Sequence, residues 1–175
     1  MTIMETQQRR AMLVAYIEDN QQAFYRLAFG YVKNADAAMD IVQEAVVKAL
    51  SNVQKLRRVE TMRTWFYRIL VNESLTYLRK NKRFVYDESR LEQLQSKQRD
   101  TAQEMDVWQA IQALPPKLRT VILLRFFEDM KLEEVAQVTQ SNLSTVKTRL
   151  YKALDVLKRS NLITQTDSDE GGNAG

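Results

Sequence analysis

Residues 139–157 read TQSNLSTVKTRLYKALDVL and predict an amphipathic helix. On a wheel of about 100 degrees per residue, one arc is apolar: Val146, Leu150, Ala153, Leu154 and Leu157. The remaining surface carries hydroxyl groups and cations: Ser144, Thr145, Lys147, Thr148, Arg149, Tyr151 and Lys152. Hydroxyls near a helix N-terminus and cations beside them are typical of helices that contact base edges and phosphates. A solvated amphipathic helix would show the same pattern, so both interpretations stay open here.

The segment just before this helix completes a helix-turn-helix pattern. LEEVAQVT, residues 132–139, predicts a short helix, and only a few residues separate it from the next one. Ser144 or Asn142 is expected to cap the second helix. The turn contains no glycine, so a left-handed residue would be Asn142 or, at a higher cost, Gln140.

Further upstream, the same half of the chain predicts two more helices. Trp108, Ile111 and Leu114 recur at helical spacing, and the pattern stops at adjacent prolines. Pro116 is expected to open the next helix, KLRTVILLRFFED, because proline suits a first helical turn. The C-terminal half therefore predicts about four short helices.

The N-terminal half predicts four helices of its own. Two are expected on either side of a break near Asp19 and Asn20, and a fourth from about Glu60 to Lys82. A third is expected to begin after Asn34, a favourable N-cap. Its predicted buried face comprises Met39, Val42, Val46, Ala49 and Leu50.

Together these patterns predict an all-α protein of two small helical domains joined by a polar linker. The expected divisions are residues 1–83 for the first domain and 84–103 for the linker. The helix-turn-helix domain is expected to cover residues 104–160, followed by a disordered tail at 161–175.

The composition restricts the chemistry available to the chain. Its 175 residues include no cysteine and no histidine, which excludes disulfides, imidazole bases and zinc sites built on these residues. No apolar run is long enough to span a bilayer, and no signal-peptide core follows the N-terminus. We therefore expect a soluble cytoplasmic protein, in which carboxylate, lysine, serine, threonine or tyrosine chemistry with a hard metal stays open.

Positive charge is concentrated in residues 55–83, which include MRTWFYRILVNESLTYLRKNKR. Nine lysines and arginines face only two glutamates there, whereas the whole chain has a net charge of +4. Cations can follow a phosphate backbone and aromatic rings can stack on unpaired bases, so this helix suits opened nucleic acid. Trp65 and Tyr67 are nevertheless expected in the core, because aromatic residues at helical spacing usually pack there.

An acidic face is predicted on the third helix, within NADAAMDIVQEAVVKAL. Asp36, Asp40 and Gln43 lie opposite its buried side, with Glu44 at the margin. The carboxylates could bind Mg²⁺, but no basic partner or glycine-rich phosphate loop accompanies them. A partner-binding surface and a simple favourable charge at the helix N-terminus are the competing interpretations.

In this order, the three motifs resemble a bacterial extracytoplasmic-function sigma factor, a small promoter-specificity subunit of RNA polymerase. DAAMDIVQEAVVKAL resembles the segment that contacts the polymerase clamp, and MRTWFYRILVNESLTYLRKNKR resembles the helix that opens and reads the minus-10 element. ALPPKLRTVILLRFFEDMKLEEVAQVT with STVKTRLYKAL resembles the domain that reads the minus-35 element. Where members often carry Leu-Gly-Ile-Ser at the turn, this chain has Thr139-Gln140-Ser141-Asn142.

The resemblance implies specific contacts and partners. Polymerase binding would use Asp40, Gln43 and Glu44. Contacts with the melted minus-10 strand would come from Arg63, Arg68, Asn72, Thr76, Arg79 and Lys80. Contacts with the minus-35 element would come from Ser144, Thr145, Lys147, Thr148, Arg149 and Lys152. The implied partners are core RNA polymerase, promoter DNA and an anti-sigma factor, commonly anchored in the membrane.

The leading hypothesis is thus a non-enzymatic initiation subunit that directs polymerase to a two-element promoter, without a cofactor, a bound metal or a small-molecule substrate. An autonomous helix-turn-helix repressor or activator, binding duplex operators as a dimer, is the main alternative. A helical adaptor without nucleic-acid function and a carboxylate-metal enzyme are the remaining ones.

Overall fold

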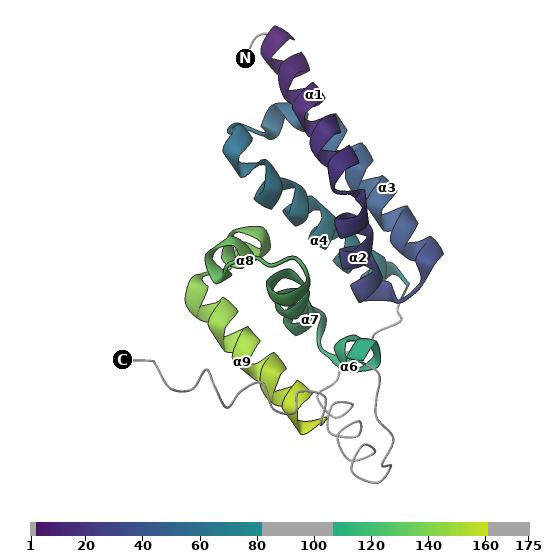
Figure 1. Cartoon of the computed structure of the whole chain (residues 1–175), viewed down its shortest axis with the longest axis vertical. Coiled ribbons are helices and arrows are strands. Elements are labelled where there is room, and N and C mark those ends of the chain that lie inside the picture. The colour runs from purple at the N-terminus through teal and green to yellow at the C-terminus, as the bar shows by residue number, and fades with distance from the viewer. Residues whose placement is uncertain (1–2, 82–106, 161–175) are drawn as a thin grey trace.

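The computed structural model describes residues 3–81 and 107–160, and these ranges contain helices and turns but no strand. The predicted all-α class is confirmed. Figure 1 shows α1 to α4 grouped on one side of the molecule and α6 to α9 on the other. The predicted linker and tail, residues 84–103 and 161–175, lie outside the described residues. Among the described helices, none combines the length and apolarity needed to cross a bilayer.

The N-terminal half consists of four long helices and two short 3₁₀ turns: α1 (Ile3–Asp19), α2 (Gln21–Val32), α3 (Ala35–Ser51), η1 (Val53–Lys55), η2 (Val59–Thr61) and α4 (Met62–Lys80). The predicted break between the first two helices lies at Asn20. Asn34 caps α3 as expected, because its side-chain oxygen accepts the Ala37 amide at 2.9 Å. Phe24 and Phe66, with ring centroids 4.3 Å apart, stand at the centre of this half.

The prediction that Met39 lies on the buried face of α3 is wrong, since this side chain is 50% exposed. The buried positions are instead mostly alanines: Ala37, Ala38, Ile41, Ala45 and Ala49. Both α2 and α4 pack against α3, and small side chains let neighbouring backbones approach closely. Val42, Val46 and Leu50 lie at the edge of this interface and are half-buried.

The C-terminal half is built from shorter elements: α6 (Val107–Ala113), α7 (Pro116–Ile122), a π-helical turn η3 (Leu123–Phe127), α8 (Leu132–Thr139) and α9 (Leu143–Arg159). Pro116 occupies the first turn of α7, as predicted. The amide of Glu128 donates to the Leu123 carbonyl at 3.1 Å, which closes the π turn. Asp129 follows in the left-handed region with φ 53°. Such π turns and strained residues are often found at functional positions.

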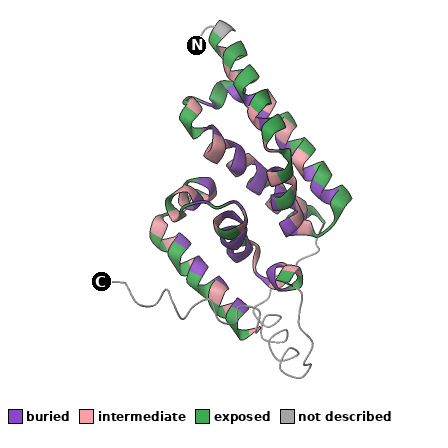
Figure 2. Ribbon diagram, viewed as in Figure 1, coloured by how far each residue is buried: buried purple, intermediate pink, exposed green. Residues whose placement is uncertain are grey.

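The two halves pack against each other through one continuous hydrophobic cluster. Helix α2 contacts α6 and η3, and α4 contacts α8. The ring of Trp108, from α6, has its centroid 5.8 Å from that of Phe29 in α2 and 5.1 Å from that of Phe127 in η3. Figure 2 shows buried residues on both sides of this boundary. The described parts of the two predicted domains therefore share a core.

Candidate nucleic-acid interface

Helix α9 presents the predicted polar face to solvent. Its N-terminus is capped by Asn142, whose Oδ1 accepts the Thr145 amide at 2.8 Å and the Ser144 hydroxyl at 2.9 Å. Four apolar residues anchor the opposite face: Val146, Leu150, Ala153 and Leu157. Of the predicted minus-35 contacts, four are exposed, namely Ser144, Lys147, Thr148 and Lys152, whereas Thr145 and Arg149 are half-buried. The helix can thus offer hydroxyls and cations together to a groove of DNA.

The turn before α9 takes the costlier of the two predicted conformations. Gln140 adopts φ 52°, in the left-handed region, whereas Asn142 has φ −77°. A left-handed residue other than glycine costs about 1 kcal/mol. The Ser141 amide returns to the Ala136 carbonyl at 3.0 Å, and Arg149 donates to the Ser141 hydroxyl at 3.1 Å. Arg149 therefore supports the turn from within the motif.

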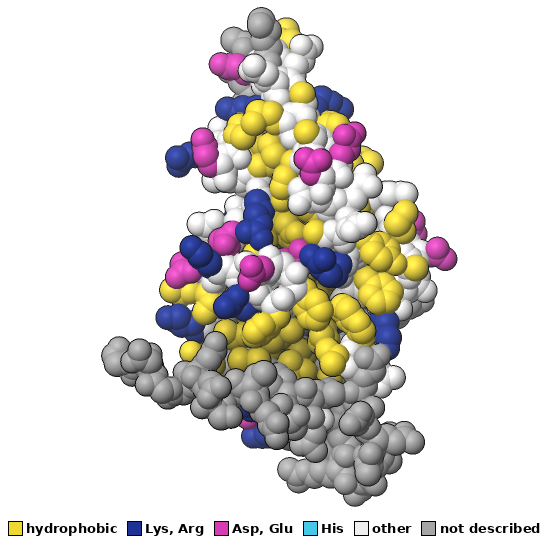
Figure 3. Space-filling model, viewed as in Figure 1, with side chains coloured by type: hydrophobic (Ala, Val, Ile, Leu, Met, Phe, Trp, Pro, Cys, Tyr) yellow, Lys and Arg dark blue, Asp and Glu magenta, His cyan; other side chains and the backbone are white. Residues whose placement is uncertain are grey.

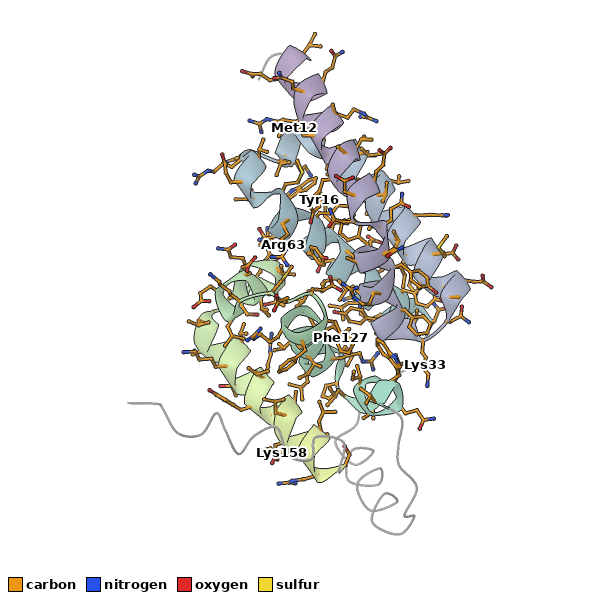
Figure 4. All side chains as sticks on the ribbon, in the orientation of Figure 1. Met12, Tyr16, Lys33, Arg63, Phe127 and Lys158 are labelled. Carbon is orange, nitrogen blue, oxygen red and sulfur yellow. The ribbon has the colours of Figure 1, made fainter. Side chains whose placement is uncertain are left out.

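Helix α4 carries the predicted basic surface, but its two ends differ. Asn72, Arg79 and Lys80 are exposed, and Thr76 accepts a hydrogen bond from Arg79 at 3.2 Å. Nearer the N-terminus of α4, two other predicted contacts face the C-terminal half: Arg63 and Arg68. Figure 4 shows Arg63 on the side of α4 that faces α8. The structure thus separates a free part of the basic surface from a covered part.

The covered part is held by specific hydrogen bonds. Arg63 donates to the Glu134 carboxylate at 2.9 Å and to the Glu128 carbonyl at 2.8 Å. Arg68 donates to the Gln137 carbonyl at 2.7 Å. All three acceptors belong to α8 or to the segment leading into it. Figure 3 shows side chains of both charges gathered over this boundary.

The acidic face of α3 is open. Asp40, Gln43 and Glu44 are all exposed, and so are Met39 and Val47 on either side of them in the sequence, at 50% and 57%. Exposed apolar side chains flanked by carboxylates are typical of a protein-binding surface. In the described ranges no group of three or more His, Cys, Asp or Glu residues is arranged to hold a metal ion.

Three residues that the sequence prediction missed connect the two halves. Arg119, fully buried, donates to the carbonyls of Tyr31, Gln112 and Leu114 at 2.7, 2.6 and 3.1 Å. Arg26 donates through Nε and Nη2 to the two carboxylate oxygens of Glu128, each at 3.2 Å. Arg119 could have been noticed in the sequence, because it stands alone as an arginine within an apolar helical run. A cation buried in such a run needs hydrogen-bond acceptors from other parts of the chain.

Glu128 is nearly inaccessible, with its side chain 2% exposed. Tyr67, buried as predicted, donates its hydroxyl to this carboxylate at 2.8 Å. Burial raises the pKa of Glu128 above its usual range, although the hydrogen bonds from Tyr67 and Arg26 oppose the shift. Burial likewise raises the pKa of nearby Tyr16 to about 12. The boundary between the halves thus contains a buried, hydrogen-bonded carboxylate.

The chain matches two protein families in the order of its two halves. Residues 16–84 match Sigma-70 region 2, and residues 104–157 match Sigma-70 region 4. Over 153 residues the chain is 49% identical to the RNA polymerase sigma factor SigV of Bacillus subtilis, covering 87% of this chain and 92% of the relative. The chain belongs to the extracytoplasmic-function sigma factors. This family consists of non-catalytic transcription initiation factors.

A second relative is similar in sequence, and two solved structures share the fold. The sigma factor shares 26% identity with the ECF RNA polymerase sigma factor SigW of Bacillus subtilis, over 77% of this chain and 81% of SigW. It has the fold of the sigma factor RpoE from Bartonella quintana, with TM-score 0.64 and 18% identity, covering 86% of this chain and 99% of RpoE. CnrH gives the same TM-score at 20% identity, covering 87% and 92%. The resemblance inferred from the motifs is confirmed at the level of the family.

Proposed function

We propose that this sigma factor binds core RNA polymerase and directs it to promoters with minus-10 and minus-35 elements. The main support for the proposal is the exposed polar face of α9, a helix capped by Asn142. This helix belongs to a chain that matches sigma regions 2 and 4 in the order found in the family. The protein acts in the cytoplasm, without chemistry of its own.

Each proposed contact belongs to one part of the chain. Residues 1–83 provide the region 2 domain, residues 84–103 the linker and residues 104–160 the region 4 domain, followed by a tail at 161–175. The polymerase clamp meets Asp40, Gln43 and Glu44. The melted minus-10 strand meets Arg63, Arg68, Asn72, Thr76, Arg79 and Lys80. The minus-35 element meets Ser144, Thr145, Lys147, Thr148, Arg149 and Lys152.

Control by an anti-sigma factor is part of the proposal. RpoE of Bartonella quintana was solved in complex with the anti-sigma factor NepR, and CnrH with the cytosolic domain of CnrY. Support for a comparable partner of this chain comes from its family and from the apolar and acidic surface that α3 leaves open. We propose a membrane-anchored anti-sigma factor that masks the polymerase-binding and DNA-binding surfaces.

Run-off transcription with purified core polymerase tests the main proposal. Genomic promoter fragments should yield specific transcripts only when the sigma factor is added. An autonomous repressor or activator would instead bind duplex DNA tightly without polymerase. Such binding, together with no binding to core polymerase, would refute the sigma-factor function.

Two matched pairs of variants test the residue assignments. Asp40→Ala should weaken competition for core polymerase, whereas Asp36→Ala removes the same charge one turn earlier on α3 and should not. Lys147→Ala should reduce transcription from promoters that depend on the minus-35 element by about tenfold, as expected for one lost DNA contact. Lys158→Ala, at the far end of α9, should leave it unchanged. Equal effects within either pair would contradict that assignment.

A further inference from the structure

A cavity of about 530 Å³ lies between the C-terminal part of α4 and the start of α7. Helix α4 belongs to the N-terminal half of the molecule and α7 to the C-terminal half (Figure 1). Sites for small molecules in proteins usually enclose about 300–1,000 Å³. The cavity is therefore large enough for an organic molecule, and the side chains that line it indicate which kind.

The floor of the cavity is aliphatic. It is formed by Leu75 and Leu78 from one half and by Pro115 and Pro116 from the other. Leu78 is buried, whereas the other three residues are half-buried. Among the described residues that line the cavity none is aromatic, so no ring is present there to favour a flat aromatic ligand by stacking. An aliphatic chain would instead bury apolar surface against all four residues.

Three polar side chains line the same cavity, and all three are exposed to solvent: Asn72, Arg79 and Lys117. Two of them are cations, and no acidic side chain is present among the described lining residues. Arg79 donates one hydrogen bond, to Thr76 at 3.2 Å, but a guanidinium group has five N–H donors. It can therefore also bind an anion, with which arginine forms strong, charge-assisted hydrogen bonds.

We propose that this cavity binds an aliphatic anion, the class to which fatty acids belong. The chain would lie on the floor of leucine and proline, and the head group would be held by Arg79 and Lys117. Burial sets this orientation, because a buried leucine lies in the floor and the cations are exposed. Asn72 can donate a further hydrogen bond to the head group. Neither half provides the complete site, since both α4 and the start of α7 contribute to it.

Isothermal titration calorimetry on the full chain tests the site, with decanoate as the probe. Decanoate should bind saturably, with one molecule per chain. Decyltrimethylammonium has the same chain with the opposite charge, and acetate has the charge without the chain. Both should bind at least about tenfold more weakly, because each lacks one of the two interactions. Equal binding of decyltrimethylammonium would assign the cavity to any apolar group, such as a side chain of a partner protein, and would overturn the proposal.

Matched substitutions test whether the binding takes place in this cavity. Lys117→Glu replaces a lining cation with a carboxylate and should weaken decanoate binding by at least about tenfold. Lys55→Glu is the control, because it makes the same change of charge at an exposed position of η1 outside the cavity. Leu75→Gln makes the floor polar and should also weaken binding. An unchanged affinity in either lining variant, or an equal loss in Lys55→Glu, would overturn the proposal.

A mononucleotide distinguishes this site from a pocket for an unpaired base. Deoxyadenosine monophosphate carries an anionic group and an aromatic base, but no aliphatic chain. It should bind more weakly than decanoate, because the floor offers no ring on which a base could stack. Tighter binding of the nucleotide would identify nucleic acid as the occupant and would overturn the proposal.

The site has a consequence for DNA binding that rests on the proposed function, in which Asn72 and Arg79 contact the minus-10 strand. A bound anion would occupy donors that the strand requires. Saturating decanoate should therefore lower the affinity for a short mixed-sequence single-stranded DNA by about tenfold in the original chain, as expected for one or two lost contacts. It should change little in Lys117→Glu. An unchanged DNA affinity with decanoate bound would overturn this competition. Failure of core-dependent transcription would refute the proposed function and leave the binding of decanoate unaffected.

Discussion

The substitution Gly30→Ala should affect helix α2 and the packing of the two halves in opposite directions. Gly30 lies inside α2, where glycine is less favourable than alanine by about 0.5–1 kcal/mol. The substitution should therefore stabilise the helix wherever the added methyl group has room. In the closed state, in which the two halves pack against each other as described, it has none, because the methyl carbon would lie 2.5 Å from Cδ2 of Leu123. In an open state, in which the halves are apart, Leu123 no longer faces Gly30.

The size of the clash follows from ordinary contact distances. Carbon atoms pack at about 3.5–4.0 Å, so Leu123 would have to retreat by about 1 Å. Leu123 is fully buried, and overpacking of such a position costs about 1–3 kcal/mol. The helix gain is common to both states, so the closed state should lose about 1–3 kcal/mol relative to the open one. That shift changes the ratio of open to closed molecules by about 5- to 150-fold.

The chain has no cysteine, so cysteines introduced at exposed Ser51 in α3 and Asp155 in α9 can carry spin labels. The distance between the labels measures this ratio, and urea unfolding measures overall stability. Gly30→Ala should lengthen the distances, and Leu123→Val should reverse much of the effect because valine lacks the two δ carbons. The double variant should therefore be more closed than the sum of the single effects predicts. Strictly additive effects, or a Gly30→Ala protein as closed as the original, would refute the reasoning.

Three further changes probe other parts of the fold. Arg119→Met should lower the free energy of unfolding by about 3 kcal/mol in urea titrations, because three buried carbonyls lose a charged donor; a loss below about 1 kcal/mol would contradict this role. The raised pKa of Glu128 means that the folded protein binds this proton at a higher pH than the unfolded chain. The contribution of Glu128 to the unfolding free energy should therefore increase as the pH falls from neutral towards 4.5. It is measured as the unfolding free energy of the original chain minus that of Glu128→Gln. A difference that does not change with pH, or that decreases as the pH falls, would contradict a raised pKa of Glu128. Asn142→Ala should cost about 1 kcal/mol of stability, whereas Asn142→Asp should retain the cap on Thr145, and equal losses in thermal melts would argue against capping.

Much of the fold was predictable because it depends on local patterns. Asn34 and the break at Asn20 follow from hydrogen bonds made within a few residues of each side chain. Helix periodicity likewise predicts α4 and α9 and their apolar faces. Met39 was misplaced because hydropathy does not show where backbones approach closely enough to require alanine. The choice of Gln140 as the left-handed residue was equally hidden, since it depends on how α8 and α9 must pack.

Family motifs and exposed faces were determined by the sequence alone, because charge and apolarity along one helix are local properties of the chain. Only the tertiary structure decided that α4 is partly covered. Arg26 and Glu128 are 102 positions apart, and no periodicity connects residues at that separation. Whether a cation meets solvent, DNA or a buried carboxylate depends on which surface the folded chain places beside it and on the cost of removing water there. Closure of the two halves, and the role of Gly30 within it, follow from that placement.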